Sequence, residues 1–167
     1  LDRSSAASDV YMRQLWNRAQ TVLDEFNALL PMHPDRLRVS VQAALIPLAH
    51  GGYLARLADL APLDRRRRGQ ALDKLQSGIN QLAPLQQRLE NPGSLKNHQR
   101  RLLLATARWR LARAHLDRAR IMTPGTPDRA ADLIAAATTL KKMSPASLGD
   151  QLQQSRTRLL AEVSRQQ

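Results

Sequence analysis

Residues 95–122, LKNHQRRLLLATARWRLARAHLDRARIM, contain neither proline nor glycine and predict the longest uninterrupted helix of the chain. Apolar residues follow two sides of this helix at steps of three and four. The first stripe consists of Leu102, Ala105, Trp109, Ala112, Leu116 and Ala119. The second, roughly opposite, consists of Leu104, Ala107, Leu111 and Ala114. A helix with two apolar sides is typical of the centre of a bundle or of a contact with a partner chain. We therefore expect the second stripe to be a partner-helix face, and a homodimer through this helix is one form of that contact.

Helix-breaking and helix-capping residues divide the rest of the chain into further helices. These are expected at residues 8–30, 35–49, 53–60, 65–90, from 127 onward, and from about 145 to 165. The sequence His50-Gly51-Gly52 is expected to stop the second helix, and Pro84 to kink or split the fourth. Residues of the type that caps a following helix are Ser94, Thr126 and Ser144.

The fold class follows from these helices and from what lies between them. No segment alternates apolar and polar residues for long enough to indicate a strand. The connections are short, which favours antiparallel neighbours. The sequence therefore predicts an all-α protein, a single-domain helical bundle over residues 1–167 with five to seven helices, mostly antiparallel neighbours.

Several kinds of chemistry lack the residues they need. Of the 167 residues, 43% are apolar and 24% are charged, but none is cysteine, which excludes disulfides, thiolate nucleophiles and cysteine-ligated metals. The histidines at 33, 50, 98 and 115 include no pair three or four residues apart, the spacing of a helical zinc site. There is also no glycine-rich phosphate loop and no nucleophile elbow. We expect no enzyme activity, no metal and no cofactor.

Positive charge is the most distinctive property of the chain. The net charge is +12, and 22 of the 26 basic residues are arginine, a bias that a GC-rich bacterial genome also produces. Residues 61–93 contribute +3 and residues 94–122 contribute +7, so ten of the twelve net charges lie between 61 and 122. Genome composition does not readily explain this concentration, and it indicates an anionic partner.

Two groups of arginines are candidate contacts for phosphate or for an acidic protein. Arg65, Arg66, Arg67 and Arg68 follow Asp64 at a helix start, where anions are favoured, and at least two of them must face water. The second group lies in the long helix and consists of Arg100, Arg101, Arg108 and Arg118. Because arginines of this helix fall between its apolar stripes, they are also expected to extend to the rims or to pair with acids of neighbouring helices.

Three functional hypotheses follow. The first is a non-enzymatic, nucleic-acid-associated accessory factor that contacts phosphates through residues 61–122. The second is an adaptor bundle that docks a partner helix or an acidic segment. The third is an extracytoplasmic sensory bundle of a membrane receptor, because the chain starts at Leu1 and is expected to be processed or part of a longer protein. No segment approaches the roughly 20 apolar residues of a membrane span. We expect a cytoplasmic location, with an extracytoplasmic one left open.

Overall fold

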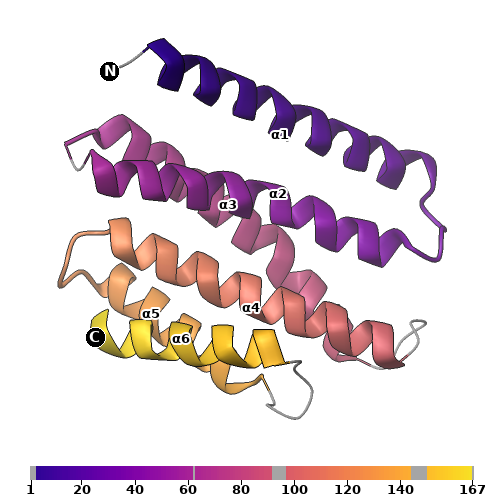
Figure 1. The fold of residues 1–167 in the computed structure, drawn as a ribbon. Helices are drawn as coiled ribbons and strands as arrows, with labels where there is room; N and C mark the ends of the chain where they lie inside the picture. Colours follow the sequence, from indigo (N-terminus) through magenta and orange to yellow (C-terminus); the bar gives the residue numbers. More distant parts are fainter. Residues whose placement is uncertain (1–2, 62, 92–96, 144–149, 167) are drawn as a thin grey trace.

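Six helices make up the part of the chain that the computed structural model describes, which is residues 3–61, 63–91, 97–143 and 150–166. They are α1 (Arg3–Leu29), α2 (Arg36–Leu60), α3 (Arg65–Glu90), α4 (Asn97–Ile121), α5 (Pro127–Lys141) and α6 (Asp150–Gln166). The described residues contain no strand. Consecutive helices lie side by side and reverse direction at each connection (Figure 1). The predicted all-α bundle with mostly antiparallel neighbours is confirmed.

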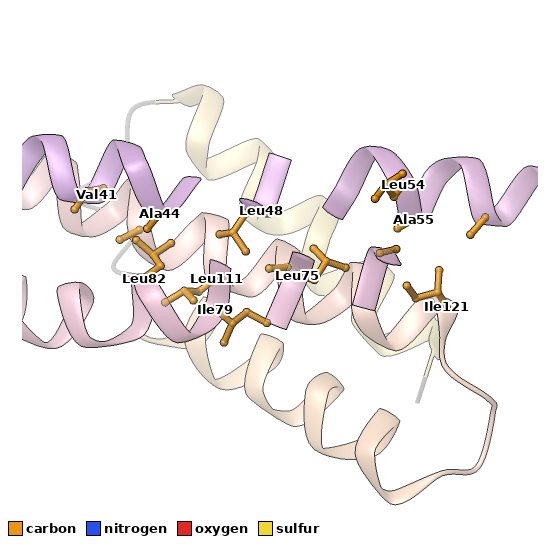
Figure 2. Close-up of a cluster of buried hydrophobic side chains, with 14 of the residues drawn as sticks. Val41, Ala44, Leu48, Leu54, Ala55, Leu75, Ile79, Leu82, Leu111 and Ile121 are labelled. Atoms are coloured by element: carbon orange, nitrogen blue, oxygen red, sulfur yellow. The ribbon is translucent and has the colours of Figure 1, made fainter. Parts of the chain in front are cut away.

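The central position predicted for residues 95–122 is also confirmed. On one side of α4, Ala107, Leu111 and Ala114 pack into a core with α2 and α3, shown in part in Figure 2. On the other side, Ala112 and Leu116 pack into a second core with α5 and α6. Helices of the same chain therefore cover both apolar stripes of α4, except at Leu102, which is 56% exposed.

The helix boundary predicted at residues 50–52 is wrong. The sequence His50-Gly51-Gly52 does not stop a helix, because α2 runs without interruption from Arg36 to Leu60. A Cβ atom on Gly51 would lie 2.8 Å from the backbone nitrogen of Leu75 in α3, and one on Gly78 would lie 3.0 Å from the backbone nitrogen of Leu48 in α2. These glycines serve the close approach of two helices rather than a turn.

The remaining differences lie at single residues. Pro84 does not split α3, which continues to Glu90. Helix α1 begins at Arg3, five residues before its expected start. Thr126 precedes α5 as the capping position, but its hydroxyl donates to the carbonyl of Thr123 at 2.9 Å rather than accepting from the helix. The caps expected at Ser94 and Ser144 fall outside the described residues.

Helix α1 is attached more loosely than the others. It lies along α2 at the edge of the bundle (Figure 1), and none of its described side chains, from Val10 onward, is buried. Phe26 contacts the ring of His33, and Trp16 contacts α2. Its outward side keeps Leu15, Val22 and other apolar residues exposed to solvent.

Candidate anion-binding site

The four adjacent arginines occupy the first turn of α3. Asp64 caps this helix by accepting a hydrogen bond from the backbone N–H of Arg67 at 2.9 Å, and its carboxylate lies 3.7 Å from the Arg67 guanidinium. An acidic cap at a helix start is favoured by the helix dipole. Arg65 and Arg66 are exposed, whereas Arg67 and Arg68 are half-buried. Two of the four arginines therefore face solvent, and the other two lie against the surfaces beside the helix.

One of those surfaces is a concave site of about 240 Å³ where α1, α2 and the start of α3 meet. We call it the arginine hollow. Helix α1 contributes Arg13 and Trp16, and the start of α3 contributes Arg66 and Arg67. The other lining residues are His50, Tyr53, Leu54, Asp64 and Gln70. Three arginines from two helices thus converge on one recess, although α1 and α3 are distant in sequence.

Aromatic rings form one wall of the arginine hollow. The rings of Trp16 and His50 stack with centroids 4.2 Å apart and an angle of 19° between their planes. The Tyr53 ring lies 5.4 Å from Trp16 at 55°. These contacts attach Trp16 of α1 to α2, and Arg13 lies one helical turn before Trp16.

His50 is the buried polar residue of this site. It is only 8% exposed, and no residue that the structure describes forms a hydrogen bond with its ring nitrogens. Burial lowers the pKa of His50 below its usual value, and the positive charges of Lys74 and Arg13 lower it further. The ring is therefore neutral near pH 7, with one donor and one acceptor nitrogen available.

Arg68 points to a second, larger hollow of about 540 Å³ on the other side of the α3 start. Arg120, Arg129 and Asp59 line it as well. Arg129 also donates to the carbonyl of Ala119 at 3.1 Å, which fixes its position at the junction of α4 and α5. The end of the bundle where α3 starts and α2 and α4 finish, on the left in Figure 1, thus carries arginines on both sides of α3.

The predicted contacts in α4 lie elsewhere and are used differently. Arg108 binds the Glu90 carboxylate at 3.0 Å and the Lys142 carbonyl at 2.7 Å. Arg118 pairs with Asp132 at 3.2 Å and hydrogen-bonds the Gln76 side chain. Both arginines tie α4 to neighbouring helices.

Arg100 and Arg101 lie near the start of α4, beside the end of α3. Because α3 has 26 residues, at 1.5 Å per residue they are separated from its first turn by roughly the full helix length. Arg100 donates to the carbonyl of Asn91 at 3.1 Å, and Arg101 is exposed. The structure therefore places Arg65–Arg68 and Arg100–Arg101 at opposite ends of the bundle, whereas Arg108 and Arg118 are held in ion pairs along α4.

The buried carboxylates of Asp117 and Asp132 pair with arginine side chains of α4. Asp117 lies 3.1 Å from Arg113, which also reaches Glu162 of α6 at 3.4 Å. Burial raises the pKa of the Asp117 carboxyl, against the lowering effect of Arg113 and Arg120. The alternative expectation for these arginines, pairing with acids of neighbouring helices, is confirmed for Arg108, Arg113 and Arg118.

The face formed by Leu104, Ala107, Leu111 and Ala114 requires a correction. Ala107, Leu111 and Ala114 are at most 3% exposed, and Leu104 packs against the same core. Helices α2 and α3 of the same chain cover this face, so it offers no surface to a partner helix and no homodimer contact. Among the described residues, exposed large apolar side chains are most numerous on α1, and others lie at single positions such as Leu60, Leu102 and Ile134.

Sequence reasoning identified the arginines of the α3 start but missed Arg13, Trp16, His50 and Tyr53. From sequence, His50 is predicted to lie at a helix end because two glycines follow it. Arg13 and Trp16 precede the α3 arginines by some fifty residues, and no local spacing relates them. Only the packing of α1 on α2 brings these residues together.

The described residues contain no group of three or more histidine, aspartate or glutamate side chains arranged to hold a metal ion. No helix among them is long and apolar enough to cross a membrane. No family model, curated protein or solved structure matches the chain.

Proposed function

We propose that this protein is a non-enzymatic, nucleic-acid-associated factor that contacts phosphates at the start of α3. The observation that carries the proposal is the convergence of Arg13, Arg66 and Arg67 on the arginine hollow. None of the carboxylates that the structure describes lies within ion-pair distance of Arg13 or Arg66. Arginines that are not neutralised by acids of their own chain provide the electrostatic attraction on which phosphate binding depends.

The expected contact region is therefore smaller than residues 61–122 and is limited to the start of α3. Arg108, Arg113 and Arg118 contribute formal charge to that segment, but carboxylates of Glu90, Glu162 and Asp132 compensate them. Arg65 and Arg66 are exposed, and neither forms an ion pair with a carboxylate of the described residues. The strongest uncompensated positive field is therefore expected at the start of α3 rather than along α4.

Fluorescence anisotropy with single-stranded DNA, duplex DNA and RNA, titrated at several salt concentrations, tests the proposal. Arg65→Ser combined with Arg66→Ser removes two exposed charges without removing a buried contact. We expect weaker binding. The slope of the logarithm of the binding constant against the logarithm of the salt concentration should be shallower by about 1 to 2 units, because fewer phosphate contacts form and fewer counterions are released.

The matched control is Arg38→Ser combined with Arg88→Ser, two exposed arginines at the far end of the bundle. It removes the same charge, so it separates a local contact from general attraction. Equal losses in both variants, or binding that disappears for the unmodified protein near physiological salt, would contradict the proposal.

The outer side of α1 favours a second candidate function, that of an interaction module. Leu15, Val22 and Leu29 recur every seven residues and are 43%, 56% and 78% exposed. Seven-residue spacing is typical of the seam between paired helices. Tyr11, 61% exposed, extends the stripe toward the N-terminus.

We propose a second copy of this chain as the occupant of that stripe. If two α1 helices pair antiparallel with Val22 opposite its equivalent, Leu15 lies opposite Leu29 of the second copy. Arg18 then lies within one residue of Glu25 of the second copy, and the twofold symmetry repeats both contacts. Charge order and apolar spacing thus support the same register.

Sedimentation velocity over a range of protein concentrations tests this second candidate. We expect a dimer that Leu15→Gln combined with Val22→Gln converts to monomer, whereas Leu60→Gln, at an exposed leucine of α2, leaves it intact. A protein that is monomeric at every concentration would exclude self-association through α1.

A further inference from the structure

The arginine hollow is small for a whole ligand but sufficient for one anionic group. Its volume of about 240 Å³ lies below the roughly 300–1,000 Å³ of typical small-molecule sites. It is nevertheless several times the roughly 30 Å³ that one water molecule occupies in the liquid. A nucleobase with its sugar and phosphate does not fit inside, but a phosphate group with bound water does.

The charges around the recess favour a doubly negative group. Arg13, Arg66 and Arg67 line it, and Lys74 lies close enough to influence His50. Asp64 is the one acid among the lining residues, and it is already engaged by the backbone and the guanidinium of Arg67. A phosphate monoester carries a charge of −1.5 to −2 at pH 7, about twice that of an internal phosphodiester.

His50 supplies a hydrogen-bonding group to the hollow. Its side chain is 8% exposed, and its ring nitrogens are not among the described buried nitrogen and oxygen atoms that lack a partner, so these nitrogens keep contact with solvent. The ring lines the hollow, and it lacks a hydrogen-bond partner among the described residues. A phosphate oxygen in the hollow would provide that partner.

We infer that the arginine hollow binds a phosphate monoester, the terminal phosphate of a nucleic-acid strand, in preference to internal phosphodiesters. That the ligand is a nucleic acid rests on the proposed function. The preference for a terminal over an internal phosphate rests on the shape of the recess. Three helices wall the site. A terminal phosphate continues into the chain on one side only and can enter, whereas an internal phosphate has sugars on both sides.

Binding of a dianion also changes the protonation of His50. The positive charges of Lys74 and Arg13 disfavour a positive imidazole, and Arg66, Arg67 and Asp64 line the same hollow. A phosphate dianion opposes the four cations, so its binding raises the pKa of His50 and draws a proton from solution. Proton uptake is therefore expected near neutral pH, and the heat of binding should depend on the ionisation enthalpy of the buffer.

The test compares one oligonucleotide with a 5′-phosphate, with a 3′-phosphate and with hydroxyl ends, alongside inorganic phosphate and sulfate as free anions. At pH 7.5 we expect a terminal phosphate to tighten binding about tenfold, because its second negative charge strengthens the charge-assisted hydrogen bonds to the arginines. Arg13→Gln should remove most of that preference, and Arg38→Gln, at the far end of the bundle, should not. In His50→Gln the heat of binding should no longer depend on the ionisation enthalpy of the buffer.

The outcomes separate the inference from the proposed function. Equal, salt-sensitive binding of all three oligonucleotides overturns the terminal preference and leaves the proposed function standing. If no oligonucleotide binds but inorganic phosphate shifts the His50 ring resonances, the proposed function and the terminal-phosphate inference both fail, and only a site for the free anion remains. If neither inorganic phosphate nor any oligonucleotide shifts the His50 ring resonances of the unmodified protein, the inference is overturned.

Discussion

At the scale of single residues, two glycines determine how closely α2 and α3 approach. Gly51 faces Leu75, and Gly78 faces Leu48, so each helix places a leucine over a glycine of the other. The arrangement keeps the backbone nitrogens near the opposing helix with no room for a methyl group. It also holds the start of α3, with its arginines, beside His50 of α2.

Replacing Gly51 by alanine is expected to lower the free energy of unfolding by about 1–3 kcal/mol, the usual cost of overpacking a core. The matched control is Gly69→Ala in α3, where a Cβ meets nothing within 4 Å. That change should raise the free energy of unfolding by roughly 0.4–1 kcal/mol, since alanine is the better helix former. Denaturant titration measures both, and a neutral Gly51→Ala would contradict the close approach.

His50 makes a pH-dependent contribution to stability. Its pKa in the folded protein lies below the unfolded value, so the unfolded chain binds more protons between the two values. The free energy of unfolding should therefore decrease as the pH falls from about 7.5 toward 5.5. In His50→Gln this part of the pH dependence should be absent, whereas His98→Gln, at an exposed position, should retain it. Parallel pH profiles for the unmodified protein and His50→Gln would exclude this role.

At the scale of elements, α4 connects two cores and two ionic networks. Its side toward α5 carries His115 and Arg118, which bind the two oxygens of the buried Asp132 carboxylate at 2.8 and 3.2 Å. Its side toward α6 carries Arg113 and Arg120, which pair with Glu162. The arginines that give this helix its charge are thus mainly structural.

Removal of one carboxylate tests that assignment. Asp132→Ala removes the buried carboxylate that pairs with Arg118 and contacts His115, and it is expected to cost about 3 kcal/mol of the free energy of unfolding. Asp128→Ala removes an exposed acid from the first turn of α5 and is expected to cost at most about 1 kcal/mol. Equal effects of the two substitutions in thermal or denaturant unfolding would show that the Asp132 network contributes little.

At the scale of the whole molecule, much of the fold could be predicted from sequence. The two stripes of residues 95–122 predicted a central helix because both sides of α4 are apolar at helical spacing. The error at Gly51 arose because glycine serves both helix ends and close helix packing, and only the position of Leu75 distinguishes them. Similarly, the partner face at Leu111 could not be distinguished from core until α2 and α3 were placed against it.

The candidate site was predictable only in part. The run at 65–68 is a local signal at a helix start and could be read directly. Arg108 and Arg118 have the same local appearance as arginines that bind phosphate, but Glu90 and Asp132 neutralise them across the bundle. Arg13 and His50 join the site through tertiary packing, which no spacing in a single sequence records.

The central claim, that phosphate is bound at the start of α3, is tested most directly by mapping. Backbone and histidine resonances of this 18.7 kDa protein can be followed by NMR while a 5′-phosphorylated oligonucleotide is added. The account predicts that shifts concentrate at Arg13, Trp16, His50 and residues 64–70, with little change at Arg38, Arg88 or Arg101. Shifts confined to the far end of the bundle, or no shifts at saturating oligonucleotide, would contradict it.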